Sequence, residues 1–156
     1  GEEKILHNGH WEETAEDSTE TRGFFIEDDG GFQKPMEYWI GAMVFTPDAK
    51  MLITGSRDNT IRFFEMPTMN ELRVVRGHNG WVRSLVVSPD GKVLISAGDD
   101  NTIRFWDIAT GRNFRTDKTH GGAVRGIALS PDGLRLASAS WDRTVKLWEG
   151  GVEPAE

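Results

Sequence analysis

The amino-acid sequence predicts an all-β fold of repeated four-stranded antiparallel sheets, with about 3.5–4 of these sheets in the chain. Two observations lead to this prediction. The chain repeats itself at a fixed period, and each repeat contains short apolar runs separated by turn residues. A period between about 20 and 50 residues is typical of architectures in which each repeat forms one structural unit.

Three unrelated motifs recur along the chain, and the interval between successive copies is the same for all of them. The dipeptide Pro-Asp begins at Pro47, Pro89 and Pro131. An Asp that precedes a Thr by two positions recurs, and so does an aromatic residue followed by an acidic one: Asp58, Asp100 and Asp142; Phe64, Trp106 and Trp148. Because no insertion separates the copies, we expect three equivalent structural units.

The middle repeat contains the signals of four strands. Residues 81–98 hold two apolar runs parted by Ser-Pro-Asp-Gly, which suits a tight reversal between antiparallel strands. Residues 102–107 alternate, which places Ile103 and Phe105 on one face of a strand. Residues 113–116 form a weaker outer strand after a glycine turn. Four strands per repeat make up one blade of a β-propeller.

The motifs resemble those of the WD-repeat β-propeller family over about residues 36–149. The resemblance rests on their order in the middle repeat: Gly77-His78, then Ser-Pro-Asp-Gly, then Asp100-Asn101-Thr102, then Trp106-Asp107. It implies that each blade holds a hydrogen-bonded tetrad of His, Ser or Thr, Asp and Trp.

The resemblance implies the following tetrad residues by position. The middle repeat supplies His78, Ser96, Asp100 and Trp106, and the last repeat supplies His120, Ser138, Asp142 and Trp148. The first repeat keeps Thr54 and Asp58 but has Phe64 in place of Trp, and Glu37-Tyr38 stands where Gly-His is expected. Its tetrad is therefore incomplete. The repetition of these letters describes the scaffold, because a buried Asp or His needs all its partners together.

We divide the chain into three parts. Residues 1–35 form an acidic N-terminal segment with a candidate outer strand and a degenerate blade, 36–149 form three WD-type blades, and 150–156 form a disordered tail. The tail is too polar to supply the outer strand of the last blade, so that edge is open. Segment 2–8 is the candidate to fill it, since the family commonly closes its ring in this way.

The charge of the chain is uneven, and it excludes some classes of partner. Residues 1–31 hold ten acidic and two basic side chains, a balance of -8, whereas residues 32–156 hold fifteen and sixteen, a balance of +1. A nearly neutral body with an acidic head does not favour nucleic acid as a partner. No apolar run is long enough to span a membrane, so no membrane partner is expected. The absence of cysteine leaves the compartment open.

No enzymatic activity, metal or cofactor is expected. His78, Ser96 and Asp100 could form a nucleophilic triad, but the last repeat copies them and an enzyme needs only one activated serine. The two imidazoles of residues 7–10 are too few for a metal site. Residues 28–31 lack the alternating oxygen ligands of a calcium loop.

The resemblance also implies a binding rim at one end of the central channel. The rim consists of the residues that open each first strand and the residue before each turn Asp: Trp39, Arg57, Trp81, Arg83, Asp99, Arg125 and Trp141, with Gly41 and Ala123 at equivalent positions. Trp and Arg are enriched at interface hot spots. We therefore predict a protein-interaction scaffold whose rim binds a peptide or protein segment, and an acidic segment suits the arginines. The alternative for Trp39 and Trp81 is partial burial between blades.

A second function is a self-assembling half-propeller with no separate ligand. An open arc of blades exposes unpaired strand edges and apolar faces. Two copies that associate head to tail around a two-fold axis would close a ring of seven or eight blades, the size that the resemblance implies. A third interpretation, that the sequence is a piece of a longer protein, stays open beside the homodimer.

Overall fold

The computed structural model describes residues 4–7, 10–13 and 39–152. These residues form strands and turns without a helix, which confirms the all-β prediction. None of the described segments has the helical length and apolar character that crossing a membrane requires.

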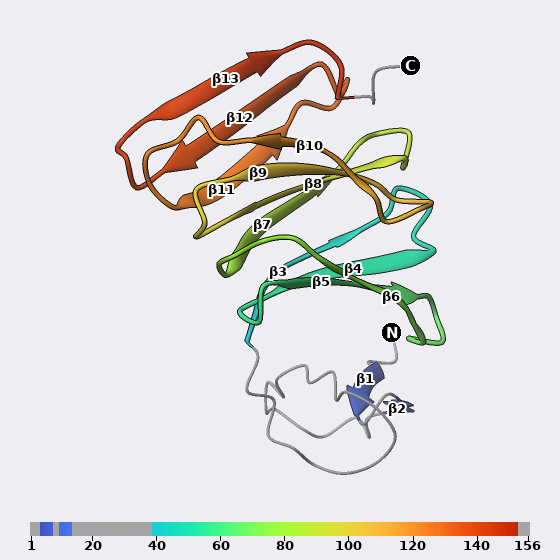
Figure 1. The fold of residues 1–156 in the computed structure, drawn as a ribbon. Coiled ribbons are helices and arrows are strands. Elements are labelled where there is room, and N and C mark those ends of the chain that lie inside the picture. The colour runs from blue at the N-terminus through green and yellow to red at the C-terminus, as the bar shows by residue number, and fades with distance from the viewer. Residues whose placement is uncertain (1–3, 8–9, 14–38, 153–156) are drawn as a thin grey trace.

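Two repeats form complete four-stranded antiparallel sheets, and we call them blades 1 and 2 (Figure 1). Their strands pair in sequence order. Blade 1 consists of β3 (Ile40–Phe45), β4 (Met51–Ser56), β5 (Thr60–Glu65) and β6 (Glu71–Arg76). Blade 2 consists of β7 (Val82–Val87), β8 (Val93–Gly98), β9 (Ile103–Asp107) and β10 (Asn113–Asp117).

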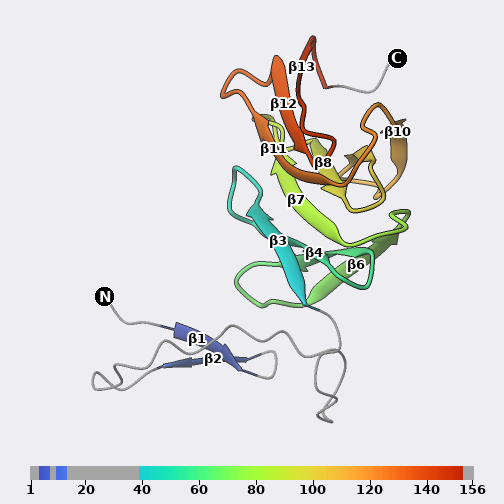
Figure 2. The same cartoon turned by 90° about the vertical axis from the view of Figure 1, so that its left-hand side faces the viewer.

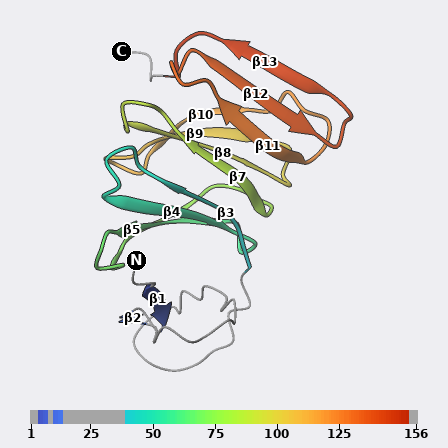
Figure 3. The same cartoon turned by 180° about the vertical axis from the view of Figure 1, so that it is seen from behind.

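Blade 3 has three strands among the described residues. They are β11 (Val124–Leu129), β12 (Arg135–Ser140) and β13 (Val145–Glu149), and β13 is the outermost of them (Figure 3). Val152, within the predicted tail 150–156, is 8% exposed and packs into the core. The described part of the predicted tail, residues 150–152, therefore differs from a disordered segment, because burial of the apolar Val152 side chain is favourable, and residues 153–156 lie outside the described residues.

The N-terminal strands pair with each other. β1 (Lys4–His7) and β2 (His10–Glu13) form a separate two-stranded sheet in which His7 lies opposite His10. Pairing of segment 2–8 with the open edge of the last blade is predicted above, but its described strand β1 pairs with β2 instead. Closing a short local hairpin loses less chain entropy than joining segments far apart in the sequence. The rest of the predicted N-terminal segment 1–35, with its degenerate blade, lies outside the described residues.

The three blades stack, with their first strands β3, β7 and β11 one above the other (Figure 2). Apolar side chains fill the space between neighbouring blades. The cluster between blades 1 and 2 includes Ile53, Ile61, Phe63, Val82, Leu94 and Trp106. The cluster between blades 2 and 3 includes Ile95, Ile103, Phe105, Val124 and Leu136. The alternation predicted for 102–107 is therefore confirmed, since Ile103 and Phe105 face blade 3 and Trp106 faces blade 1.

Candidate functional site

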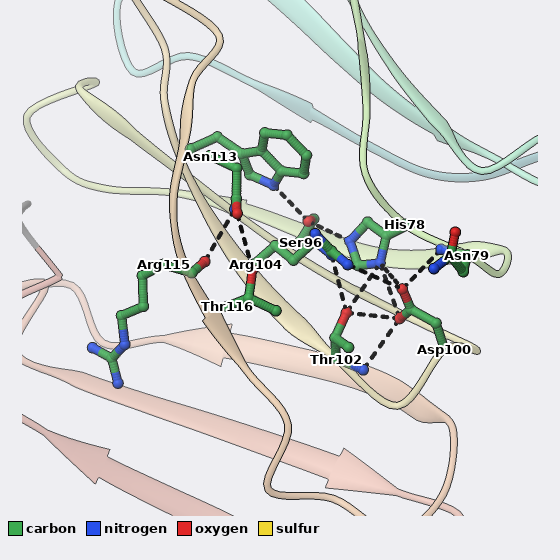
Figure 4. A network of polar contacts seen from close by, with 10 residues as sticks. His78, Asn79, Ser96, Asp100, Thr102, Arg104, Asn113, Arg115 and Thr116 are labelled. Carbon is green, nitrogen blue, oxygen red and sulfur yellow. Dashed lines mark hydrogen bonds and ion pairs between the residues drawn. The ribbon is translucent and has the colours of Figure 1, made fainter.

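The core of blade 2 contains a chain of hydrogen bonds between four side chains from different segments. The Trp106 Nε1–H donates to Ser96 Oγ over 2.8 Å, and Ser96 Oγ lies 2.7 Å from His78 Nε2. His78 Nδ1 lies 2.9 Å from an oxygen of Asp100 (Figure 4). These hydrogen bonds thus join the loop before β7, the strands β8 and β9, and the turn between β8 and β9.

The chemistry of the groups fixes the direction of these bonds. An ionised carboxylate only accepts hydrogen bonds, so the proton of the imidazole is on Nδ1 of His78 and points at Asp100. Nε2 then accepts from the Ser96 hydroxyl, whose oxygen accepts from Trp106. Every polar atom in the chain has a partner, which is what burial demands.

Asp100 stabilises the turn between β8 and β9, in which it lies. Its carboxylate accepts hydrogen bonds from the backbone N–H of Asn79 at 2.9 Å and from the backbone and hydroxyl of Thr102 at 3.1 and 2.8 Å. Burial alone would raise the pKa of Asp100, but the hydrogen bond from His78 and the bonds from Asn79 and Thr102 outweigh it. The pKa of Asp100 therefore lies well below its ordinary value.

Blade 3 contains the same series of side-chain hydrogen bonds, and one of them is longer. His120 Nδ1 lies 2.7 Å from Asp142, and His120 Nε2 lies 2.7 Å from Ser138 Oγ. The Trp148 Nε1–H donates to Ser138 over 3.3 Å. The hydrogen bond from Thr144 lowers the pKa of Asp142, and the bonds from His120 and Gly121 add to that against partial desolvation.

Blade 1 lacks such a chain among the described residues. Thr54, at the position of Ser96, has a buried hydroxyl without a hydrogen-bond partner in the described structure. Asp58 still accepts from the backbone and the hydroxyl of Thr60, at 2.9 and 2.6 Å, and pairs with Arg62 at 3.2 Å. The turn of blade 1 is thus held by local bonds rather than by a chain across the sheet.

The Ser-His-Asp geometry of blade 2 resembles a nucleophilic triad in its distances only. Ser96 is 0% exposed and its oxygen already accepts from Trp106, so a substrate outside the protein cannot reach it. Ser138 in blade 3 is buried in the same way. The described residues contain no group of three His, Cys, Asp or Glu side chains arranged to hold a metal ion.

One backbone hydrogen bond in each blade joins the two halves of the rim. The N–H groups of Arg57, Asp99 and Trp141 donate over 2.9 Å to the carbonyls of Trp39, Trp81 and Ala123. The residue that opens each first strand is thereby held beside the residue that precedes each turn Asp. The rim residues of the three blades therefore lie at the same end of the stack.

A β-bulge near the start of each first strand contributes the remaining rim positions. The register between β7 and β8 shifts between Val82 and Ser84, so Arg83 is not paired with a residue of β8. Equivalent shifts leave Gly41 unpaired on β3 and Arg125 unpaired on β11. A bulge changes the direction of the extra side chain, which suits a residue that serves a surface rather than the sheet.

Aromatic and cationic groups alternate along the part of the rim made by blades 1 and 2. The rings of Trp39 and Trp81 meet edge to face with centroids 6.4 Å apart. The guanidinium of Arg57 lies 5.7 Å from the Trp39 ring and 5.6 Å from the Trp81 ring. Arg83 stacks on the Trp81 ring at 3.4 Å. These distances are those of cation–π contacts.

The row continues through Asp99 to blade 3. Arg83 holds Asp99 with two bonds of 2.9 and 2.6 Å, and Arg125 approaches the same carboxylate at 3.5 Å. Arg125 also stacks over the Trp141 ring at 4.6 Å. All seven predicted rim residues are therefore connected in one row across the three blades.

The tryptophans of the rim differ in exposure. Trp39 is 63% exposed and Trp141 68% exposed. Trp81 is half-buried against blade 1, where a Cβ on Gly41 would lie 2.4 Å from its Nε1. Partial burial between blades thus applies to Trp81 and not to Trp39. Gly41 stands at the position of Arg83 because only a residue without a side chain leaves room for this indole.

Comparison with known proteins identifies the repeats. The family model described as "WD domain, G-beta repeat" matches residues 34–65, 69–107 and 111–149. A structure of U3-55K and a crystal structure of the RRP9 WD40 repeats each match 74% of this chain, with a TM-score of 0.70 and 28% identity. The chain covers 37% of the length of each of those two chains.

Asp100→Asn should destabilise the protein by about 1–3 kcal/mol at neutral pH, because the imidazole loses its charged acceptor. In the wild type the native pKa of Asp100 lies below its unfolded value, so the native state binds fewer protons. This contribution to stability is present above about pH 4 and is lost as the pH falls below it.

Denaturant unfolding between pH 7 and pH 3 measures the effect. We expect the variant to lose less stability than the wild type on acidification. Glu71→Gln, at the exposed start of β6, is the control and should stay within about 0.5 kcal/mol of the wild type. If the stability of Asp100→Asn fell as steeply with decreasing pH as that of the wild type, Asp100 would not be the source of the acid-dependent loss.

Proposed function

The chain belongs to the WD-repeat family, and we propose that within it the chain is a non-catalytic protein-interaction scaffold that binds a peptide or protein segment along its rim. The observation that carries this proposal is the connected row of Trp and Arg side chains at one end of the blades. A scaffold role also agrees with the burial of Ser96 and Ser138, the serines of the two triad-like sets.

The rim has the chemistry of an interface hot spot. Trp39 and Trp141 offer large apolar surfaces to solvent, and neighbouring arginines hold their rings in place. Ordering a side chain on binding costs free energy, and a ring that is already stacked has less freedom to lose. The row is therefore suited to an extended segment that crosses from blade 1 to blade 3.

The charge of the rim favours an acidic segment. Three arginines and one aspartate give the row a formal balance of +2, from Arg57, Arg83 and Arg125 against Asp99. Opposite charge on a partner raises the rate of association and sets its register. The acidic character of the partner is thus part of this proposal.

A library of random peptides displayed on phage, selected on the wild-type protein, tests the rim. We expect enriched peptides to carry acidic residues and to bind Trp141→Ala about tenfold or more weakly, as is usual for a hot-spot tryptophan. Leu72→Ala, an exposed residue on the outer strand β6, is the control and should bind as the wild type does. Peptides that bind Trp141→Ala and Trp39→Ala as tightly as the wild type would overturn the proposal.

We propose self-association as a second function, because both end faces of the stack expose apolar side chains at core positions. On blade 1, Met43 is 57% and Phe45 52% exposed. Of the equivalent positions in the next repeat, Leu85 belongs to the core between blades 1 and 2 and Val87 is partly buried against that core.

The last blade has the complementary face. Val145 is 75% and Leu147 63% exposed on β13. The equivalent positions of the preceding repeat, Ile103 and Phe105, are buried between blades 2 and 3. Each end face thus repeats one side of an interface that the protein already builds twice, and a second copy of the chain fits both. Head-to-tail contacts of this kind close into a ring when the rotation per copy allows it.

Two double variants separate head-to-tail assembly from non-specific association. Met43→Asp/Phe45→Asp blocks the blade 1 face, and Val145→Asp/Leu147→Asp blocks the blade 3 face. By sedimentation we expect two chains for the wild type and one for each variant alone. An equimolar mixture should regain a two-chain species, because each variant keeps the face that the other lacks.

A wild type that stays a single chain at micromolar concentration would contradict the self-association. So would a mixture that fails to associate while circular dichroism shows both variants folded. The rim proposal stands or falls independently, since none of the four substituted residues belongs to the rim.

A further inference from the structure

The turns that carry the rim differ in charge from blade to blade. Arg57, Asp99 and Trp141 occupy the same position in successive repeats, so the turn residue is a cation in blade 1, an anion in blade 2 and an aromatic in blade 3. A ligand that crosses the rim therefore meets a different chemical group on each blade. This asymmetry gives the rim a direction.

Asp99 already neutralises part of the rim. It binds Arg83 through two short bonds and lies 3.5 Å from Arg125. Both arginines also stack on tryptophan rings. Arg83 in particular holds the Trp81 ring and the Asp99 carboxylate in fixed positions, and its charge is balanced within the protein.

Arg57 differs from these arginines. Among the described residues no carboxylate lies within ion-pair distance of its guanidinium, although Arg62 on the following strand pairs with Asp58. Arg57 is exposed, and its guanidinium lies near both the Trp39 and the Trp81 rings. Its backbone N–H is bonded to the Trp39 carbonyl, which fixes the start of the side chain.

An arginine held in this way is suited to bind an anion. Contact with two aromatic rings orients the guanidinium while part of its surface still faces solvent. Its planar fork of N–H donors matches the two oxygens of a carboxylate or a phosphate. Neither indole can neutralise the charge of Arg57, so within the described part of the chain its guanidinium is available to form an ion pair with a ligand.

We propose that Arg57 is the anion-binding residue of the rim, which takes a carboxylate or phosphate group of a bound segment, and that Arg83 is a positioning residue for Trp81 and Asp99. This inference rests on the proposed function of the rim and assigns one ligand group to one residue. The acidic group of the ligand lies at blade 1, and its apolar part extends toward Trp141 on blade 3.

Four fluorescein-labelled peptides test the proposal. They have the sequence fluorescein-Gly-Pro-X-X-Leu-Gly-amide, with the label on the N-terminal nitrogen, in which X is Glu, Gln, phosphoserine or serine, and their affinities are measured by fluorescence anisotropy. We expect the wild type to bind the Glu or the phosphoserine peptide at least tenfold more tightly than its neutral analogue. Which of the two binds more tightly identifies the source of the anion.

The variants Arg57→Gln and Arg57→Lys locate the contact. Arg57→Gln should lose the preference for the charged peptide, and Arg57→Lys should regain part of it because the charge returns without the planar fork. Arg112→Gln removes the same charge from the exposed loop between β9 and β10 and should leave the preference unchanged. Thermal unfolding by circular dichroism checks that all three variants are folded.

The inference is overturned if Arg57→Gln keeps the preference, or if the wild type binds charged and neutral peptides equally. Its failure is distinguishable from failure of the rim. Library peptides that need Trp141 but not Arg57 would leave the rim in place without this anion site. An anion preference that depends on Arg57 but not on Trp141 would support the anion site without the extended rim.

Discussion

The structure depends on a buried chain of hydrogen bonds from Trp106 through Ser96 and His78 to Asp100. Each of these groups would be costly inside a sheet on its own, because burial removes the water that satisfied it. Together they satisfy one another and tie a loop, two strands and a turn into one unit. The same requirement in blade 3 explains why the sequence repeats its polar residues as faithfully as its apolar ones.

The buried chain also supports the surface. Asp99 directly precedes Asp100, so the turn held by His78 is the turn that presents a rim residue. The backbone bond from Asp99 to Trp81 then fixes the start of the next rim position. In blade 1 the bonds of Asp58 to Thr60 and Arg62 hold the turn beside Arg57. The hydrogen bonds that hold the turns therefore also fix the positions of the rim residues that we propose bind a partner.

The sequence was sufficient to predict much of this architecture, because local signals and periodicity determine it. Turn residues and alternation predicted the strands, and the constant interval between repeats predicted which positions are equivalent. The tetrad and rim residues were predicted from the resemblance to the WD-repeat family. The positions of His78 and Trp106 made that resemblance specific. These features depend on residues that are close in the sequence or repeat at a fixed spacing.

The contacts that the sequence did not predict depend on register and on packing between blades. The bulges at Arg83 and Arg125 follow from how two strands pair, which no single residue signals. The ion pair between Arg83 and Asp99 leaves Arg57 as the arginine without an acidic partner in the described rim. A glycine at position 41, where the other repeats have arginine, was the one available sign of the close approach of Trp81.

The role of the buried hydrogen bonds is tested most directly by comparing two hydroxyls at equivalent positions, those of Ser96 and Thr54. Ser96→Ala leaves His78 and Trp106 without their shared partner, and we expect a loss of about 2 kcal/mol or more in the free energy of unfolding. Thr54→Val removes a buried hydroxyl that has no partner among the described residues, and we expect unchanged or increased stability. Equal losses for the two variants, measured by denaturant unfolding at pH 7, would contradict that role.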